Sequence, residues 1–359
     1  MLLNMNKRSQ VVTSILLASN CMSSVVLAEQ FTLIALPDTQ FYSRYREASQ
    51  YLNYDNPYLT QMKWIRDKSA ERNIRFTMHL GDIVDQATVN EEWVFASQAH
   101  AILDDAGISY GVARGNHDVI PQSAANPPAA PFTDWFGPSR FAGMPTYRSS
   151  SPDGVNSYHV FEGGGREFGV LFTDWRNNQA DLDWARSVLQ ANASKPTILI
   201  SHEILGPNFA DPSNPNTTAH GQLLFDELIA GHNQIFMTIS GHNQGTGWKI
   251  VENNFGNEVL QHFADFQFCP FNGAGYLREL NFDTEANTIS ARTFSPWLEQ
   301  VRDLGIVIPP FFNVPTELTS PQAQFTWAVN FDDRFGVIPE PAAMVLIAEV
   351  FAAGARRRA

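Results

Sequence analysis

The sequence predicts an α/β protein built on layered sheet, and two observations support this class. From Phe31 onward, short apolar strands alternate with amphipathic helical stretches. The first half of the chain follows a strand-helix-strand-helix-strand pattern, whereas the last strands follow one another without long helices, which indicates some antiparallel pairing. With 359 residues, 44% of them apolar, the chain can bury a large core. We expect one main domain and find no internal repeat.

The expected elements are defined by the period of their apolar residues. Alternation and β-branched or aromatic content predict strands over Phe31–Leu36, Arg75–Leu80, Ile108–Ala113, Phe168–Thr173, Thr197–Ser201, Ile235–Ser240, Val259–Phe263, Tyr276–Phe282 and Thr288–Phe294. Apolar residues three and four apart predict helices over Tyr58–Arg72, Glu91–Ala106, Ala180–Ala191 and Gln222–Ala230. Three stretches without periodicity are expected to be loops that wall or cover a site: Pro121–Ser151, Gly206–His220 and Leu304–Thr326.

Charge and cysteine content exclude several classes of function. The formal net charge is -13, from 24 Lys and Arg against 37 Asp and Glu. A surface this acidic argues against nucleic-acid binding by a basic face. The chain has 2 cysteines, Cys21 and Cys269, and this number excludes a cluster of thiolate metal ligands.

The N-terminus has the pattern of a secretory signal peptide. Lys7 and Arg8 precede the apolar stretch Val11–Ser19, and small residues lead to Ala28. We therefore expect a signal peptide over residues 1–28, the alternative being a buried N-terminal helix.

The C-terminus carries Pro339-Glu340-Pro341, then an apolar run over Ala342–Ala353, then three arginines from Arg356. This order resembles the PEP-CTERM sorting signal of Gram-negative bacteria, so we expect a sorting segment over residues 337–359 and a main domain over 29–336. The resemblance implies cleavage by a sorting protease and release to the cell envelope or extracellular matrix. Membrane contact is then expected only through the unprocessed ends. The alternative is an amphipathic tail.

Polar clusters directly follow five of the predicted strands. In an open α/β sheet, the carboxyl ends of parallel strands meet at one edge, where ligand sites form. The clusters contain Asp, Asn and His, which are the ligand types of a divalent-metal centre for hydrolysis. They read Asp38-Thr39-Gln40, Gly81-Asp82-Ile83-Val84-Asp85, Gly115-Asn116-His117-Asp118, Ser201-His202-Glu203 and Gly241-His242-Asn243-Gln244.

These clusters resemble the motifs of calcineurin-like metallophosphoesterases, a family of dinuclear-metal phosphatases and phosphodiesterases. The family pattern is Asp-x-His, Gly-Asp-x-x-Asp, Gly-Asn-His-(Asp/Glu), His and Gly-His-x-His, and the match runs from about Leu33 to Gln244. The resemblance implies a four-layer α/β/β/α sandwich. It also implies that Asp38 binds one metal and Asp82 bridges the pair, with the second metal on Asn116, His202 and His242.

Two positions depart from the family pattern, and both fall on the first metal site. Gln40 and Gln244 stand where the family has histidine. A Gln amide oxygen is as many bonds from Cβ as an imidazole Nε2, so both side chains could still bind the metal. The first site would then have oxygen donors only and would suit Mn²⁺, Mg²⁺ or Fe better than Zn²⁺. We expect two divalent ions in all.

The implied function is that of an exported phosphoric-ester hydrolase, either a phosphatase or a phosphodiesterase. In such an enzyme a metal-bridging hydroxide attacks the phosphate ester, and His117 protonates the leaving group or holds the transition-state phosphoryl group. Asp118 directly follows His117 and is expected either to orient its ring or to raise its basicity. The alternative is a catalytically weak or inactive surface or matrix binding protein, which the loss of two first-site histidines favours. Arg114, beside Gly115, is expected either to meet a substrate phosphate or to form a structural ion pair.

Overall fold

A computed structural model describes residues 30–124 and 126–336. The predicted signal peptide and the predicted sorting segment lie outside the described residues. Within the described residues, no helix is both long and apolar enough to cross a membrane.

The first sheet is mixed and has the strand order β15-β14-β13-β1-β2-β3, with β16 also paired to β14. Its three strands β1, β2 and β3 are parallel, and the pairs on the other side of β1 are antiparallel. The strands are β1 (Gln30–Leu36), β2 (Ile74–His79), β3 (Tyr110–Val112), β13 (Leu277–Asp283), β14 (Thr288–Phe294), β15 (Glu317–Leu318) and β16 (Phe325–Ala328).

The second sheet has the strand order β11-β12-β10-β7-β6-β5-β4. Its central strands β12, β10, β7 and β6 are parallel, and antiparallel strands extend it on both edges. The strands are β4 (Tyr147–Ser150), β5 (Ser157–Gly163), β6 (Arg166–Thr173), β7 (Thr197–Ser201), β10 (Ile235–Ser240), β11 (Gly245–Glu252) and β12 (Glu258–Asp265). A small ribbon pairs β8 (Leu205–Gly206) with β9 (Asn216–Thr217).

The helices are placed between and after the strands. They are α1 (Gln40–Arg44), α2 (Pro57–Lys68), α3 (Asn90–Asp105), α4 (Phe132–Phe136), α5 (Pro138–Phe141), α6 (Gln179–Ala191), α7 (Ala219–Leu224), α8 (Pro270–Gly273), α9 (Pro296–Asp303) and α10 (Phe331–Phe335), with a π-helical turn over Phe225–Ile229. Side-chain caps begin α2 and α6. Asn56 caps α2, and Asn178 forms a capping box with Asp181 at the start of α6.

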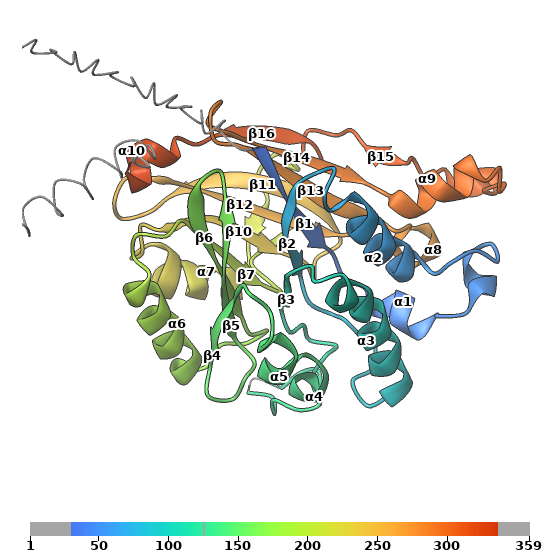
Figure 1. Ribbon diagram of the computed structural model, residues 1–359, viewed down its shortest axis with the longest axis horizontal. Helices are drawn as coiled ribbons and strands as arrows, with labels where there is room; N and C mark the ends of the chain where they lie inside the picture. The colour runs from blue at the N-terminus through green and yellow to red at the C-terminus, as the bar shows by residue number, and fades with distance from the viewer. Residues whose placement is uncertain (1–29, 125, 337–359) are drawn as a thin grey trace, which may run out of the picture. The chain divides into compact units, whose positions relative to one another are not determined.

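Three hydrophobic clusters hold the layers of helices and sheets together. The middle cluster joins the two sheets, with Leu33 and Met78 from the first sheet and Val170 and Ile239 from the second. The second cluster packs α2 and α3 on the outer side of the first sheet, and the third packs α6 and α7 on the outer side of the second (Figure 1). The predicted four-layer α/β/β/α sandwich is therefore confirmed.

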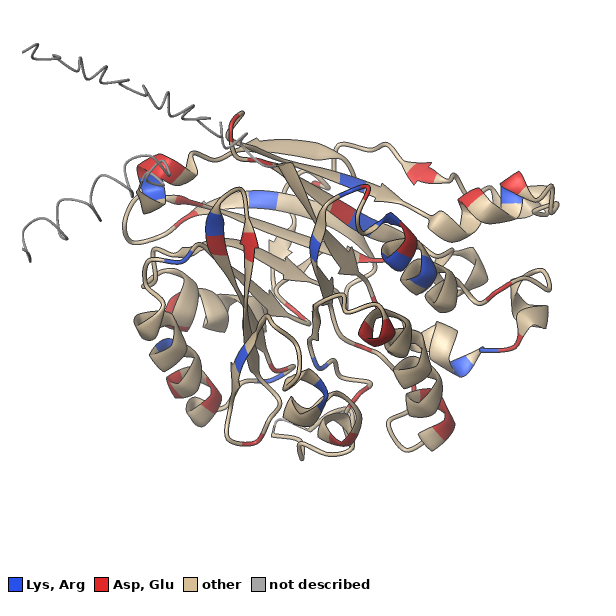
Figure 2. Ribbon diagram, in the orientation of Figure 1, with Lys and Arg blue, Asp and Glu red and all other residues tan. Residues whose placement is uncertain are grey.

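All nine predicted strands and all four predicted helical stretches are present, with boundaries shifted by a few residues. The prediction missed β5 and β11, which extend the second sheet at opposite ends. It was also wrong to treat the three expected loops as wholly irregular. Pro121–Ser151 contains α4, α5 and β4, Gly206–His220 contains β9, and Leu304–Thr326 contains β15. Acidic and basic residues are interspersed along both sheets and the outer helices (Figure 2).

Candidate metal centre

The structure brings together side chains that follow parallel strands of both sheets. Asp38 and Asp82 follow β1 and β2, Asn116 follows β3, and His202 and His242 follow β7 and β10. The two sheets pack face to face, so the carboxyl ends of these strands meet. The expected convergence of the strand-end clusters is therefore what the fold produces.

Asp82, His202 and His242 form the tightest group. One ligand atom from each of them lies within 4.8 Å of the others. The Nε2 atom of His202 is 3.2 Å from Asp82 Oδ2 and 3.2 Å from Asn116 Oδ1. The rings of His202 and His242 have centroids 5.0 Å apart. Carboxylate, imidazole and amide groups thus converge on one small volume.

The orientation of His202 is fixed by the backbone. Its Nδ1 lies 2.8 Å from the carbonyl oxygen of Leu80 and donates a hydrogen bond to it. In the neutral imidazole, Nε2 then carries the lone pair, and this lone pair faces the oxygens of Asp82 and Asn116. Three electron-pair donors meeting in this way are the arrangement of a metal site, and the mixture of nitrogen and oxygen suits a transition metal.

Glycines allow the close approach of these groups. A Cβ built on Gly81 would overlap His202 Nδ1, one on Gly115 would overlap Asp82 Oδ1, and one on Gly241 would overlap Asp38 Oδ1. Each of these glycines directly precedes a site residue, and none of the three could carry a side chain without displacing a site residue. The glycines of the motifs are therefore explained by packing against the site itself.

Backbone strain is concentrated at two of the site residues. Asp82 has φ of 52° and His242 has φ of 66°, which is the left-handed region that side chains other than glycine seldom occupy. Such conformations are maintained only where the surroundings impose them, and they cluster at functional sites. The strained backbone at both residues therefore favours a functional role for this site.

The charges at the site depend on burial and on one another. Asp38 and Asp82 are 3% and 1% exposed. Burial and the negative charges of Asp265 and Asp82 raise the pKa of Asp38 well above its usual range. Burial also opposes ionisation of Asp82, but the neighbouring His202 outweighs it and lowers the pKa of Asp82. Carboxylates crowded in this way have a strong electrostatic preference for a divalent cation between them.

His117 lies beside the group rather than within it. Its backbone N–H donates to Asp82 Oδ1 over 2.8 Å, and its Nδ1 lies 2.7 Å from the carbonyl oxygen of Asp85 and 3.4 Å from Asp85 Oδ1. Burial disfavours the charged imidazole, but the contact with Asp85 and the charge of Asp82 outweigh burial and raise the pKa of His117 to about 9. A hydrogen bond from Nδ1 to Asp85 leaves Nε2 as the atom available for proton transfer.

Asp118 has a different role from the one expected. The orienting contact to the His117 ring comes from Asp85, not from Asp118. The fully buried carboxylate of Asp118 accepts hydrogen bonds from the backbone N–H groups of Gly115, Ile83 and Val84 over 2.8 to 3.1 Å. It therefore ties the loop after β2 to the loop after β3 and positions their residues.

The two glutamines of the predicted first site are placed differently. Gln40 is 1% exposed, and its Oε1 has no hydrogen-bond partner. Gln244 is exposed to solvent. The prediction that both bind metal stays a prediction, and burial supports it for Gln40 alone.

Asp265 and Gln267, at and after the end of β12, were not predicted to belong to the site. Asp265 is 0% exposed, and its charge acts on Asp38. Asp265 lies just after the predicted strand Val259–Phe263, as Asp38 and Asp82 lie just after theirs, but the sequence did not indicate that this strand is parallel to its neighbour. It was missed because the motifs of the resembled family include no residue at this strand.

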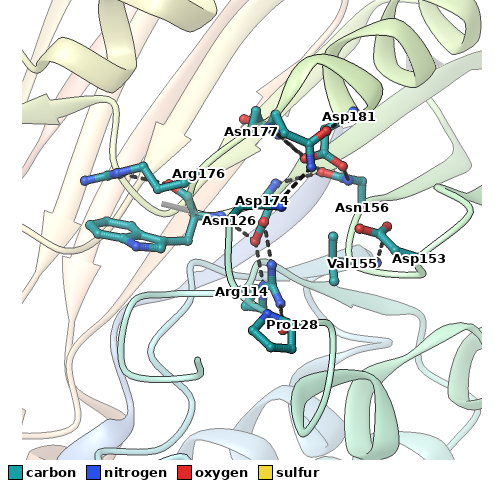
Figure 3. Close-up of polar contacts among 12 residues, drawn as sticks. Arg114, Asn126, Pro128, Asp153, Val155, Asn156, Asp174, Arg176, Asn177 and Asp181 are labelled. Carbon is teal, nitrogen blue, oxygen red and sulfur yellow. Dashed lines mark hydrogen bonds and ion pairs between the residues drawn. The ribbon is translucent and has the colours of Figure 1, made fainter. Parts of the chain in front are cut away.

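Arg114 forms the structural ion pair of the two expected alternatives. Its guanidinium donates to both carboxylate oxygens of Asp174 over 2.6 and 2.5 Å, and it also donates to the carbonyl of Pro128 (Figure 3). Arg114 and Asp174 are 1% and 2% exposed. The pair therefore joins the end of β3 to the end of β6.

Trp175, next to Asp174, was also missed by sequence reasoning. Its ring centroid lies 4.8 Å from that of His242 and 5.5 Å from that of His202. Arg176 places its guanidinium 3.4 Å from the Trp175 ring centroid and pairs with Glu203. The indole thus packs against both histidines and limits their rotation.

Comparisons with known proteins bear on the fold. No protein-family model matches the chain. The chain is 28% identical over 277 residues to the uncharacterized protein YvnB of Bacillus subtilis (strain 168), a match that covers 76% of this chain and 20% of YvnB. The chain thus spans about a fifth of the length of this curated relative.

Solved structures with a similar fold include three phosphatases or nucleotidases. A dimetal phosphatase from Danio rerio is 14% identical and has a TM-score of 0.42, over 75% of this chain and 96% of that one. The purple acid phosphatase PPD1 from yellow lupin (Lupinus luteus) is 11% identical with a TM-score of 0.49, over 87% and 56%. A 5'-nucleotidase from Candida albicans is 10% identical with a TM-score of 0.41, over 91% and 58%. Identities this low do not extend to function, which is inferred below from the site residues.

Proposed function

We propose that the protein is a metal-dependent phosphoric-ester hydrolase with two divalent ions at the strand ends. The observation that carries the proposal is the convergence of Asp82, His202 and His242 with Asn116 and Asp38, at the carboxyl ends of strands from both sheets. A purely structural role would not require buried carboxylates and imidazoles to face one another without an intervening apolar layer.

The residues present fit a pair of divalent ions that share Asp82. His202, His242 and Asn116 would hold one ion, and Asp38 would hold the other. When bound, such ions stabilise the charge of a phosphoryl group and acidify water near neutral pH. The protein holds its own groups in place for this chemistry through the Leu80 carbonyl on His202 and the close-packed glycines.

His117 is proposed as the proton donor to the leaving oxygen. Asp85 fixes its ring through Nδ1, and Nε2 is left to transfer the proton. Arg44, which donates to the other carboxylate oxygen of Asp85 over 2.6 Å, holds Asp85 in turn. Asp118 fixes the loops that carry Asp82 and His117 through its hydrogen bonds to their backbone.

The test is hydrolysis of p-nitrophenyl phosphate and bis(p-nitrophenyl) phosphate by purified protein loaded with Mn²⁺. We expect activity on at least one ester, and we expect Asp82→Asn to abolish it. Asp183→Asn, which makes the same chemical change on an exposed part of α6, should retain full activity. Bound metal without hydrolysis of either ester would instead favour the alternative of a binding protein.

We also propose that the protein is exported and then held at the envelope or released to the matrix. The support comes from the N-terminal apolar stretch and the Pro339-Glu340-Pro341 tail. Mass spectrometry of protein from the native cells should find an N-terminus near Glu29 and a C-terminus near Val337. A chain that retains Met1 or Arg358 would contradict the corresponding part.

A further inference from the structure

Asp265 lies at the carboxyl end of β12, the strand that pairs with β10. In the parallel pairing of β10 with β12, Ser240 is level with Phe263. Continuing this register by two residues brings Asp265 level with His242. Across the antiparallel pair with β11, Asp265 lies opposite Gly245, the residue after Gln244. The fold therefore places a carboxylate beside the position where the family motif has its last histidine.

Asp265 is part of a buried group of carboxylates. It is 0% exposed, and it shares its surroundings with Asp38 and Asp82, which are nearly as buried. Of the charged groups around Asp38, Asp265 exerts the largest repulsion, ahead of Asp82. The charges that act on Asp265 itself are those of Asp82 and His202. Buried carboxylates whose charges act on one another are costly to keep ionised without a cation.

A buried amide oxygen without a partner lies next to this group. Gln267 Nε2 donates to Asp265 Oδ2 over 3.1 Å, and Gln267 Oε1 accepts from Gln40 Nε2. This chain of contacts uses the nitrogen of Gln40 and leaves its Oε1 without a hydrogen bond. A buried acceptor left unpaired in this way is unfavourable, and a metal ion would satisfy it.

A structural role alone does not account for Asp265. Its Oδ1 accepts from the backbone N–H of Gln267 over 2.8 Å, which is the contact of an ordinary Asx turn. An asparagine would make that contact without burying a charge. The turn also leaves the Gln40 oxygen unexplained.

We propose that Asp265 is a ligand of the first metal ion and takes the place of the missing histidine at position 244, with Gln267 positioning the Gln40 amide so that its oxygen faces the same ion. The first site is then formed by Asp38, Gln40, Asp82 and Asp265. This inference rests on the proposed function, since it assigns one of its two ions.

The proposal has a consequence for metal preference. Three carboxylates and an amide oxygen form a set of hard oxygen donors, whereas the second site contains two imidazoles. Hard ions such as Mn²⁺ and Mg²⁺ should occupy the first site in preference to Zn²⁺. The two sites should therefore be separable by choice of metal.

The test is Mn²⁺ binding by calorimetry, read out without any substrate. Wild-type protein should bind two ions per chain. Asp265→Asn should retain the ion at His202 and His242 but weaken the other by more than about 100-fold, because loss of a supporting group alone commonly weakens metal affinity 10- to 100-fold. Gln244→Ala tests the competing assignment, in which Gln244 is the ligand, and it should bind both ions as the wild type does.

The outcomes separate this inference from the proposed function. Wild-type protein that binds no metal would overturn both. Two ions of unchanged affinity in Asp265→Asn, or loss of one ion in Gln244→Ala alone, would overturn the assignment of Asp265 while leaving the hydrolase proposal intact. If Asp265→Asn does not fold, anomalous scattering from Mn²⁺ in crystals of the wild type decides. An ion within about 2.0–2.6 Å of an Asp265 oxygen supports the proposal, and an ion away from it refutes it.

Discussion

At the scale of single residues, the contacts of His117 separate proton transfer from metal binding. Its ring is held through Nδ1 by Asp85, and its backbone N–H is directed at Asp82. The ring therefore borders the metal group without joining it. A residue placed in this way should affect the leaving group and leave the metal content unchanged.

This placement gives a prediction for His117→Ala. An alkoxide needs a proton as its bond to phosphorus breaks, whereas p-nitrophenolate departs without help. The variant should lose about 10²- to 10⁴-fold in kcat on an alkyl phosphate ester and distinctly less on a p-nitrophenyl ester. Equal losses on both esters would indicate positioning of the phosphoryl group, and lost metal would make His117 a ligand.

Residue identities at the site were predictable to different degrees. Asp38, Asp82, Asn116, His202 and His242 stand in recognisable motifs. The support given by Asp85 to His117 could not be predicted, because it depends on how the loop after β2 folds back toward the loop after β3. The same is true of the backbone contacts of Asp118.

At the scale of elements, the Arg114–Asp174 pair joins the ends of β3 and β6. Both side chains are almost wholly buried, and Asp174 also accepts a hydrogen bond from the backbone N–H of Trp175 over 2.7 Å. The pair thus links the first sheet to the segment that packs against His202 and His242.

Arg114→Ala should destabilise the fold by about 3–5 kcal/mol, because it leaves the carboxylate of Asp174 buried without its partner. Chemical denaturation of the metal-free protein measures this. The double variant Arg114→Met with Asp174→Asn should recover part of the loss. A single variant with wild-type stability and a raised KM would instead make Arg114 a substrate-binding residue.

His159 on β5 gives a prediction about pH. Its two ring nitrogens have no hydrogen-bond partner, and the ring packs against Phe76, Phe141 and Phe172. Burial, assisted by the positive charge of Arg148, lowers its pKa from 6.5 to about 3. Between these two values the unfolded chain binds a proton that the folded chain does not, so this residue makes the protein less stable as the pH falls below 6.5.

His159→Phe should remove that contribution, which amounts to roughly 2 kcal/mol at pH 5. We expect the variant to be at least as stable as the wild type at pH 7 and to lose less stability between pH 7 and pH 5. Unfolding by urea at both values measures the difference. An identical loss in the two proteins would mean that His159 is not neutral in the folded state.

Two physical causes explain why several elements were missed by the sequence analysis. β11 contains Gly245 and Gly247 and is only half-buried at the sheet edge, so its apolar alternation is weak. The helices α4 and α5 are a single turn or little more, which is too short to show a helical period. The fully buried strands β7 and β10 were predicted to the residue because each is a short run of mostly apolar and β-branched residues.

At the scale of the whole molecule, the fold brings segments that are distant in the sequence together at one site. The strand ends of both sheets contribute, and the core between the sheets sets their separation. The alternation of strands and helices predicted the class of fold, and the motifs predicted which edge carries the site. The sequence pattern could not show that β12 contributes Asp265 to that edge, because this depends on the strand order of the second sheet.

The most direct test of the account is a titration of metal-free protein with Mn²⁺ in which bound ions and hydrolysis of bis(p-nitrophenyl) phosphate and p-nitrophenyl phosphate are followed together. We expect no hydrolysis without metal, and activity that rises as the second ion binds. Asp82→Asn, which lacks the shared carboxylate, should show no such rise at the Mn²⁺ concentrations that fully activate the wild type. Hydrolysis by the metal-free protein, or full activity of Asp82→Asn, would contradict the assignment of this site as a dinuclear hydrolytic centre.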